Sequence, residues 1–347
     1  SNKGDEVRKL VLDALYPRDA MEYMEYRRLA REHIEHLAAL EALEDMDEGD
    51  FLLVDGSLFG RMVHVFRRIR IPGKEHFMVS YVEAYYEVLS KALERHVTVV
   101  GVAKDSRSTV LREELLTAKL SACLNECNEG ARVELMSLWL KMRRGLKGVL
   151  KRVKDLASSR AISEHIVELF EEVADPTPDF KFIILLRLGP GHSKPLKLHV
   201  SRISAGFLDE ALVEARRGTS DLRESVGEGT SDALAKIGSY PSVLSFYTIL
   251  GEGDLPLRVD VVSEEVKSLK TELGSSFVAN AGGLIASTLS VLSSLYAGPK
   301  HYNVLLERVD GRVKMRLSTL EQYKKIIEDS YKELLEQSRG IRRVSFP

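Results

Sequence analysis

Residues 51–57 of the chain read FLLVDGS. Four consecutive apolar residues are typical of a strand buried on both faces, and the Asp-Gly-Ser that follows is typical of a turn. A carboxylate at the tip of a central strand, here Asp55, can hold a divalent metal beside a cleft, because hard cations prefer carboxylate oxygens. The alternative interpretation is an ordinary turn in which Asp55 has no chemical role.

The sequence predicts further strands and long helices on both sides of this segment. Apolar runs bounded by turn residues predict strands at 62–71, 97–103, 180–188, 196–203, 243–250 and 257–262. Apolar residues three and four apart predict helices at 6–46, 111–173, 264 onward, 275–294 and 317–338, and 77–93 begins like a strand and continues as a helix. Together these elements indicate an α/β fold with a mixed sheet flanked by helices and with helical insertions.

Composition narrows the class of protein. The formal net charge of -2, from 50 basic and 52 acidic side chains, excludes a chain that is basic throughout, but it allows a local basic face. Two cysteines exclude a disulfide framework and indicate a reducing compartment, so we expect a cytoplasmic protein. The apolar stretch at 274–298 is too rich in Ser and Gly for a membrane span, and residues 1–6 do not resemble a signal peptide.

Three strand candidates end at or contain a carboxylate, namely Asp55, Asp105 and Asp260. A charge in or just beyond a buried strand is costly unless it is paired or bound to a metal. Two metal ions held by such acids can activate water and stabilise a leaving oxygen in phosphodiester hydrolysis. For Asp260 the alternative is a plain ion pair with Arg258, which lies two residues earlier on the same strand face.

A second candidate feature is a basic helical segment at 141–154. Basic side chains that could contact DNA phosphates are Lys141, Arg143, Arg144 and Lys147, together with Arg107 after an earlier strand. The alternative is a solvated helix face without a ligand. A single tryptophan and 7% aromatic residues argue against a binding surface built from many base-stacking rings.

Two of these segments carry a family resemblance. The sequences FLLVDGSLFGR at 51–61 and VTVVGVAKDSRS at 97–108 resemble the NurA family of archaeal and bacterial 5′ to 3′ nucleases. Shorter segments in the same order are similar to further motifs of that family: 162–164, 258–260 and 302–310. The resemblance spans about 51–310.

The resemblance implies an RNase H-like sheet, a homodimer, Mn²⁺- or Mg²⁺-dependent DNA cleavage and a partnership with the hexameric translocase HerA. It also implies an organisation into three parts. Residues 1–50 would form an N-terminal helical arm, and 51–310 the nuclease domain with a helical insertion at about 111–173. Residues 311–347 would form a C-terminal helix.

The resemblance assigns roles to single residues as well. Asp55, Glu164 and Asp260 are the implied metal ligands, with Lys104 near the scissile phosphate and Tyr302 at the family's tyrosine. Asp310 stands where the family has a histidine, and His301 is the neighbouring imidazole that could replace it. A further acid between Lys104 and Glu164 is unplaced; the eligible residues are Asp105, Glu113 and Glu114.

We therefore expect a metal-dependent deoxyribonuclease of the 5′ to 3′ exonuclease or single-strand endonuclease type. It would act in DNA end resection and double-strand break repair with a HerA-type translocase. Two alternatives from other classes are an impaired relative that binds DNA or HerA as an adaptor, and a structural α/β interaction protein whose acids only cap and pair.

Overall fold

A computed structural model describes residues 20–64, 77–104, 106–143, 146–159, 162–175, 177–200, 239–272, 275–313, 321–322 and 325–326. Its strands are β1 (Phe51–Asp55), β2 (Thr98–Ala103), β3 (Gly191–His192), β4 (Leu196–Leu198), β5 (Val243–Ile249) and β6 (Leu257–Val262). They lie in the order β1-β2-β6-β5-β3, and β4 also pairs with β5. β1 runs parallel to β2, and all the other pairs are antiparallel, namely β2 with β6, β6 with β5, and β5 with β3 and β4. The predicted mixed sheet is therefore confirmed.

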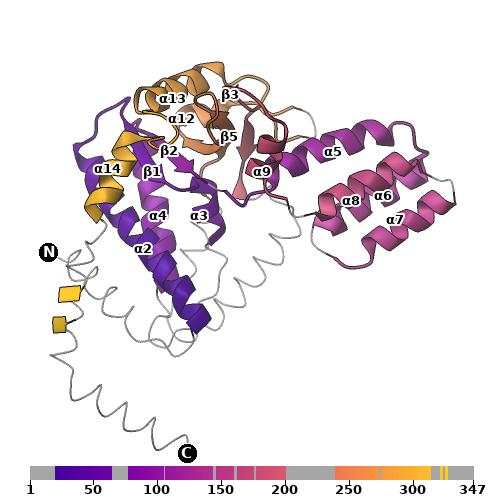
Figure 1. The fold of residues 1–347 in the computed structure, drawn as a ribbon, viewed down its shortest axis with the longest axis horizontal. Coiled ribbons are helices and arrows are strands. Elements are labelled where there is room, and N and C mark those ends of the chain that lie inside the picture. Colours follow the sequence, from indigo (N-terminus) through magenta and orange to yellow (C-terminus); the bar gives the residue numbers. More distant parts are fainter. Residues whose placement is uncertain are drawn as a thin grey trace, which may run out of the picture. The chain divides into compact units, whose positions relative to one another are not determined.

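Helices cover both faces of this sheet. Figure 1 shows α2 (Ala20–Ala42), α3 (Leu58–His64) and α4 (Phe77–Glu94) on one side, and α12 (Glu264–Ser268) and α13 (Gly282–Ser294) on the other. All six residues of β6, and all but the last of β5, are buried between them. This double cover explains why both strands read as nearly continuous apolar runs.

The N-terminal helix α2 is part of the core of the sheet. It packs on α4 and is followed by the 3₁₀ turn η1 (Leu43–Asp45). Leu29 of α2 and Leu43 of η1 are fully buried in the hydrophobic cluster that also contains Tyr81 of α4 and Val99 of β2. The described part of the segment expected as an arm therefore contributes core side chains rather than only a surface.

Four helices between β2 and β3 form what we call the helical insertion (residues 110–174). They are α5 (Val110–Leu124), α6 (Glu129–Arg143), α7 (Val149–Ser158) and α8 (Glu164–Ala174). Their apolar faces share a hydrophobic cluster of their own, in which the Trp139 ring meets the Phe170 ring edge-on at 5.1 Å. The insertion thus has its own packing core, separate from that of the sheet.

One strand expected from the sequence is a helix instead. Residues 180–188 read FKFIILLRL, and the segment forms α9 (Asp179–Leu185). An apolar side chain at nearly every position leaves no period to distinguish the two structures. The helix begins after Pro178, with the Asp179 carboxylate in its first turn, and both features favour a helix N-terminus.

Two other expectations also change. Residues 58–64 form α3, so the strand expected at 62–71 is wrong in its first part, and the remainder lies outside the described residues. Residues 77–94 are helical from their first residue, with Tyr81, Tyr85 and Val88 buried at helical spacing.

The chain divides into two compact units, Ser1–Ser293 and Ser294–Pro347. The second unit contains α14 (Val304–Val313), and most of the helix expected at 317–338 lies outside the described residues. In the described parts of both units, no helix combines the length and the apolar character needed to cross a membrane.

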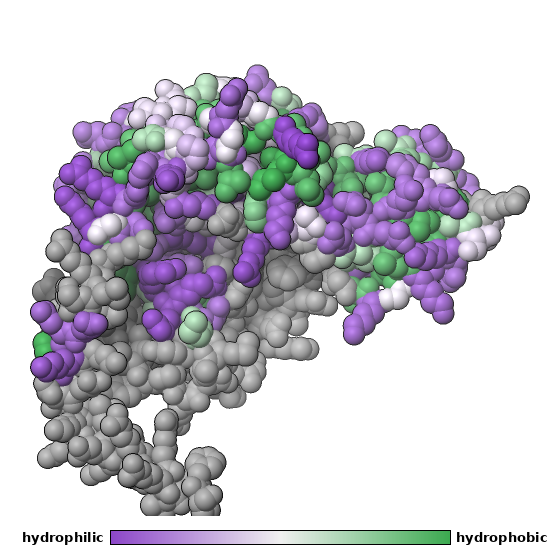
Figure 2. All heavy atoms as spheres, viewed as in Figure 1, coloured by the Kyte–Doolittle hydropathy of each residue, from purple (hydrophilic) through white to green (hydrophobic). Residues whose placement is uncertain are grey.

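Large apolar side chains are exposed at the end of α9. They are Ile184, Leu185, Leu186 and Leu188. Figure 2 shows hydrophobic residues gathered on this part of the molecule among hydrophilic ones. Contiguous exposed apolar patches of this kind commonly mark interaction sites.

Candidate functional site

Asp55 lies at the end of β1, where a turn leads directly into α3. We call residues 55–60 the Asp55 turn. Gly56 adopts a φ of +109°, which favours glycine, and its N–H donates to the Val102 carbonyl at 2.9 Å. The Ser57 hydroxyl then accepts the Gly60 N–H at 2.9 Å, as an N-cap of α3. Asp55 is exposed, and its carboxylate has no hydrogen-bond or ion-pair partner within the described residues.

Arg61 supports the turn from below. Its Nη2 donates to the Asp55 carbonyl oxygen at 2.9 Å and pairs with the Glu35 carboxylate of α2. The side chain of Arg61 is 6% exposed. Burial alone would lower the pKa of Arg61, but the charge of Glu35 raises it above its ordinary value, so the guanidinium stays charged. The main chain of Asp55 is thereby tied to α2.

Asp260 lies in the middle of β6 and is fully buried. Its Oδ2 accepts the Ser57 hydroxyl at 2.5 Å and the Phe59 N–H at 3.1 Å. Its Oδ1 accepts the Ser245 hydroxyl at 2.7 Å and Arg258 Nε at 3.0 Å. The ion pair with Arg258, which was the alternative reading of this acid, is therefore present, and all four bonds come from protein groups.

Gly101 of β2 leaves room for the Asp55 turn. It pairs with Val54 on one side and with Asp260 on the other. A Cβ at this position would lie 2.6 Å from the Gly56 carbonyl oxygen and 2.7 Å from Leu58 Cγ. The turn thus passes directly over the backbone of β2, and glycine permits this close approach.

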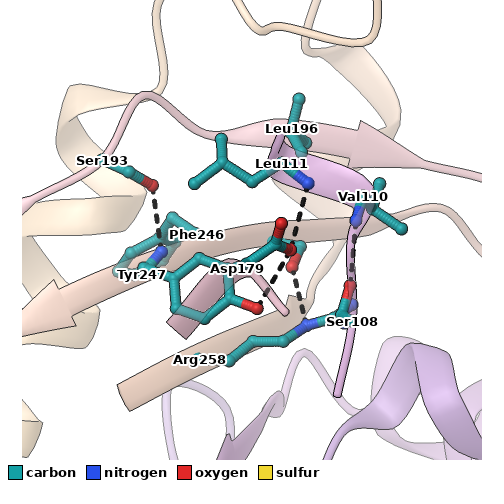
Figure 3. Close-up of a pocket in the computed structure, with 10 residues that line it drawn as sticks. Ser108, Val110, Leu111, Asp179, Ser193, Leu196, Phe246, Tyr247 and Arg258 are labelled. Atoms are coloured by element: carbon teal, nitrogen blue, oxygen red, sulfur yellow. Dashed lines mark hydrogen bonds between the residues drawn. The ribbon is translucent and has the colours of Figure 1, made fainter. Parts of the chain in front are cut away.

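A second buried polar group continues from Asp260 along β5 and β6. Arg258 is buried, and its Nη2 has no hydrogen-bond partner among the groups that the structure describes. It lines a cavity of about 10 Å³, the space of about one water molecule, together with Tyr247, Asp179 and Ser108 (Figure 3). Burial alone would lower the pKa of Arg258, but the Asp260 carboxylate raises it above its ordinary value.

Asp179 closes this cavity from α9. Its two oxygens accept the N–H groups of Leu111 at 3.1 Å and Arg112 at 2.9 Å, and Tyr247 donates to it at 3.1 Å, as Figure 3 shows for Leu111 and Tyr247. Burial raises the pKa of Asp179, against the opposing effect of the N–H group of Arg112. The carboxylate therefore caps α5 and joins the helical insertion to the sheet.

The other predicted residues of the first unit come from other segments. Lys104 is exposed in the bend after β2, and Arg107 is exposed in the loop that follows. Glu164 is the exposed first residue of α8, whose helix packs on α5, α6 and α7 of the helical insertion. Across the described ranges, no three His, Cys, Asp or Glu side chains are arranged to hold a metal ion. The structure therefore does not bring Asp55, Glu164 and Asp260 together.

The predicted residues of the second unit are described by themselves. Tyr302 is buried, with 8% of its surface exposed. His301 is exposed, and its Nδ1 lies 2.6 Å from Glu307 Oε2. Asp310 is exposed on α14. Because this unit is not placed relative to the first, it does not locate these residues with respect to Asp55.

The basic segment of the helical insertion is partly neutralised. Arg143 pairs with Glu113 at 3.0 Å and with Glu114 at 3.6 Å, whereas Lys141 and Lys147 are exposed. Arg144 lies outside the described residues. The acids come from α5, so a reading confined to 141–154 could not detect the pairing.

The family model of the NurA domain matches residues 3–315, which is most of the chain. The protein belongs to the NurA domain family. Among solved structures it is similar to the NurA nuclease from Sulfolobus solfataricus, at 14% sequence identity and a TM-score of 0.44, over 88% of this chain and 68% of that one. No curated protein matches the sequence at a significant level.

Membership of the NurA family raises the question of whether the implied metal ligands fit. Asp55 does, because its carboxylate is exposed and unpartnered within the described residues. Asp260 does not, because a carboxylate offers about four lone-pair positions and four protein donors use them. Glu164 is an exposed residue of α8, and the apolar side chains of that helix belong to the hydrophobic cluster of the helical insertion. As a set of three, these residues do not form a metal site.

The structure also adds residues that the sequence reasoning missed. Ser57 links the Asp55 turn to Asp260, and a Ser directly before a helix is a recognisable N-cap signal. Asp179 follows a proline, which is also a helix-start signal, but the apolar run behind it concealed the helix.

Proposed function

We propose that this NurA-family protein is a DNA nuclease that hydrolyses phosphodiester bonds. The observation that carries the proposal is the Asp55 turn: within a NurA domain, an exposed and unpartnered carboxylate is held at the tip of a strand by buried groups. In phosphodiester hydrolysis, an acid that acts on the substrate or a metal must be fixed in position. Its carboxylate must also be free of hydrogen bonds to the protein, and Asp55 meets both requirements within the described residues.

Lys104 supports the same location. Asp55 pairs with Val102 of the parallel strand β2, and Lys104 lies two residues after Val102, in the bend that follows the strand. The carboxyl ends of parallel strands meet at one edge of a sheet, so a positive charge stands near Asp55. Such a charge would attract a DNA phosphate and offset the negative charge that develops during attack.

Dependence on Mn²⁺ or Mg²⁺ is part of the proposal, with Asp55 as a ligand. Because the three expected ligands do not fit together, we assign no reaction step to a metal. The finer features are proposals on the strength of the family resemblance: an RNase H-like sheet, 5′ to 3′ or single-strand cleavage in end resection, a homodimer and a HerA-type ATPase as partner. The exposed apolar side chains at the end of α9 support the existence of a partner surface.

The direct test replaces Asp55 by asparagine, which keeps the shape of the side chain and removes its charge. We expect Asp55→Asn to lose at least about a hundredfold in Mn²⁺-dependent degradation of linear DNA, since catalytic acids typically contribute that much. Asp47→Asn is the matched control, because Asp47 is an exposed acid before the other end of β1. Equal degradation by wild type and Asp55→Asn would refute the proposal.

The alternative function is a DNA- or HerA-binding adaptor without cleavage. The saturation of Asp260 by protein donors and the aspartate at position 310 favour it. A Mn²⁺ titration separates the two: the nuclease should show a metal site that Asp55→Asn weakens. The adaptor should show none, and no variant should change DNA degradation.

A further inference from the structure

We propose that Asp260 is a positioning residue that holds the Asp55 turn, and not a ligand of the metal. The inference rests on the proposed function, because it describes how the acid of that site is kept in place. It replaces the role that the family resemblance implies for Asp260 by one derived from its contacts.

Both oxygens of Asp260 are already used by hydrogen bonds from the protein. Oδ2 is used entirely by the Asp55 turn, through the Ser57 hydroxyl at 2.5 Å and the Phe59 N–H at 3.1 Å. Those two residues lie two and four positions after Asp55. A metal bound to Asp260 would have to displace one of these donors and leave it buried without an acceptor, which is costly.

The negative charge of Asp260 is balanced by a neighbouring arginine. A buried carboxylate needs a compensating charge, and Arg258 supplies it at 3.0 Å while itself only 5% exposed. Ser245 adds a bond to the same oxygen at 2.7 Å. One oxygen of Asp260 is thus bonded to Arg258 of β6, which neutralises its charge, and to Ser245 of β5, while the other is bonded to the turn, so its environment requires no cation.

The Asp55 turn lies in close contact with the backbone of β2. At Gly101 there is no space for even a methyl group beneath the Gly56 carbonyl. The turn can therefore keep its place only if it is drawn onto the sheet, and Asp260 supplies that attraction from the strand next to Gly101. Through Ser57, the buried acid sets where the exposed acid lies.

Two serines allow a matched experiment, because both donate to Asp260 but only one belongs to the turn. Ser57→Ala removes the bond between the turn and Asp260, together with the N-cap bond to Gly60, and leaves the carboxylate intact. Ser245→Ala removes the bond between Asp260 and β5. We expect Ser57→Ala and Asp260→Asn each to slow Mn²⁺-dependent DNA degradation by about tenfold, as the loss of a charged hydrogen bond predicts. Ser245→Ala should stay within about threefold of wild type.

The combination of variants separates positioning from ligation. For a positioning residue, the loss in the double variant Ser57→Ala with Asp260→Asn should be smaller than the product of the two single losses, since both substitutions remove the Ser57–Asp260 bond. Ser57→Thr, which keeps a hydroxyl, should recover most of the rate, and added Mn²⁺ should rescue none of the variants. A much larger loss in Asp260→Asn than in Ser57→Ala, reversed by raising Mn²⁺, would overturn the proposal in favour of a ligand.

Amide hydrogen exchange gives a readout that does not depend on cleavage. In Asp260→Asn the Phe59 and Gly60 amides should exchange about tenfold faster than in wild type, while amides of β5 keep their protection. Should Asp260→Asn fail to fold, Ser57→Ala carries the same test at Phe59, whose N–H keeps its own acceptor on Asp260. Unchanged exchange in the turn would refute the positioning role, even if Asp55→Asn is inactive. Faster exchange in a protein that never cleaves DNA would refute only the nuclease.

Discussion

Different kinds of interaction stabilise the Asp55 turn and the helical insertion. The turn depends on a few buried polar contacts between residues far apart in sequence, such as Ser57 and Asp260, which are 203 positions apart. The insertion depends on apolar side chains that pack locally around Trp139, with charge pairs such as Arg152 and Glu134 on its surface. A polar anchor defines direction and distance closely, whereas an apolar cluster tolerates adjustment, so the candidate chemistry lies on the more sharply defined region.

The largest expected effect separates the two cores. Trp139→Ala should cost about 3–5 kcal/mol, because it removes a fully buried ring, its contact with Phe170 and the bond to Thr117. Exchange protection should fall across α5–α8 and remain in β5 and β6. Leu140→Ala on the same helix, at an exposed side chain, is the control and should change stability by less than about 0.5 kcal/mol. Loss of protection throughout the sheet as well would show that the two cores are one.

The next effect concerns the fit of the turn against β2. Gly101→Ala should cost about 1–3 kcal/mol, because the new methyl group meets the Gly56 carbonyl oxygen, and it should also slow DNA degradation by moving Asp55. Gly283→Ala, where nothing lies within 4 Å of the added methyl, is the control and should be neutral or slightly stabilising in α13. Thermal unfolding together with a nuclease assay measures both; normal activity in Gly101→Ala would contradict the close fit.

A smaller effect is the dependence of stability on pH, which involves a histidine close to Arg61. His36 of α2 is buried and stacks on Tyr85 at 4.6 Å, with Tyr81, His33 and Arg61 around it. Burial, with a smaller effect of Arg61, lowers the pKa of His36 well below its ordinary value. The unfolded chain therefore binds a proton that the folded protein does not, and stability falls as the pH drops below about 6.5, by up to about 1.4 kcal/mol per unit.

His36→Phe removes that titration while keeping a ring against Tyr85. Denaturant unfolding between pH 7.5 and 5, a range chosen around the ordinary histidine pKa of about 6.5, should show a smaller acid loss in this variant than in wild type. Leu140→Ala, at an exposed side chain without an ionisable group, is the control and should leave the pH profile as it is. Identical profiles for wild type and His36→Phe would exclude His36 as the source.

The smallest effect tests the surface of the helical insertion. Lys147→Ala should weaken DNA binding modestly and reduce the slope of log affinity against log salt by about 1, because one phosphate contact is lost. Lys119→Ala is the control, as an exposed lysine of α5 outside the basic segment. Fluorescence anisotropy at several salt concentrations measures both. An unchanged slope would show that this helix is only a solvated face.

Local patterns allowed much of the fold to be predicted, and contacts between distant residues account for the rest. The runs at 51–54, 97–103 and 257–262 became β1, β2 and β6 because both faces of these strands meet apolar neighbours or helices. The strand predicted at 180–188 is wrong, since a helix with apolar side chains on nearly every side has no period that distinguishes it from a buried strand. The position of Asp55 could be predicted from its turn, but the saturation of Asp260 could not, because its donors come from three separate segments.

The position of a bound metal on the intact chain can be mapped by the cuts that it directs in the polypeptide. With Fe²⁺ in place of Mn²⁺, ascorbate and peroxide generate radicals that cut the polypeptide close to the metal. If Asp55, held in place by its buried anchor, carries the chemistry, the cuts should fall at residues 55–57 and near Lys104, and Asp55→Asn should abolish them. Cuts confined to the start of α8 around Glu164, or an unchanged pattern in Asp55→Asn, would contradict this assignment.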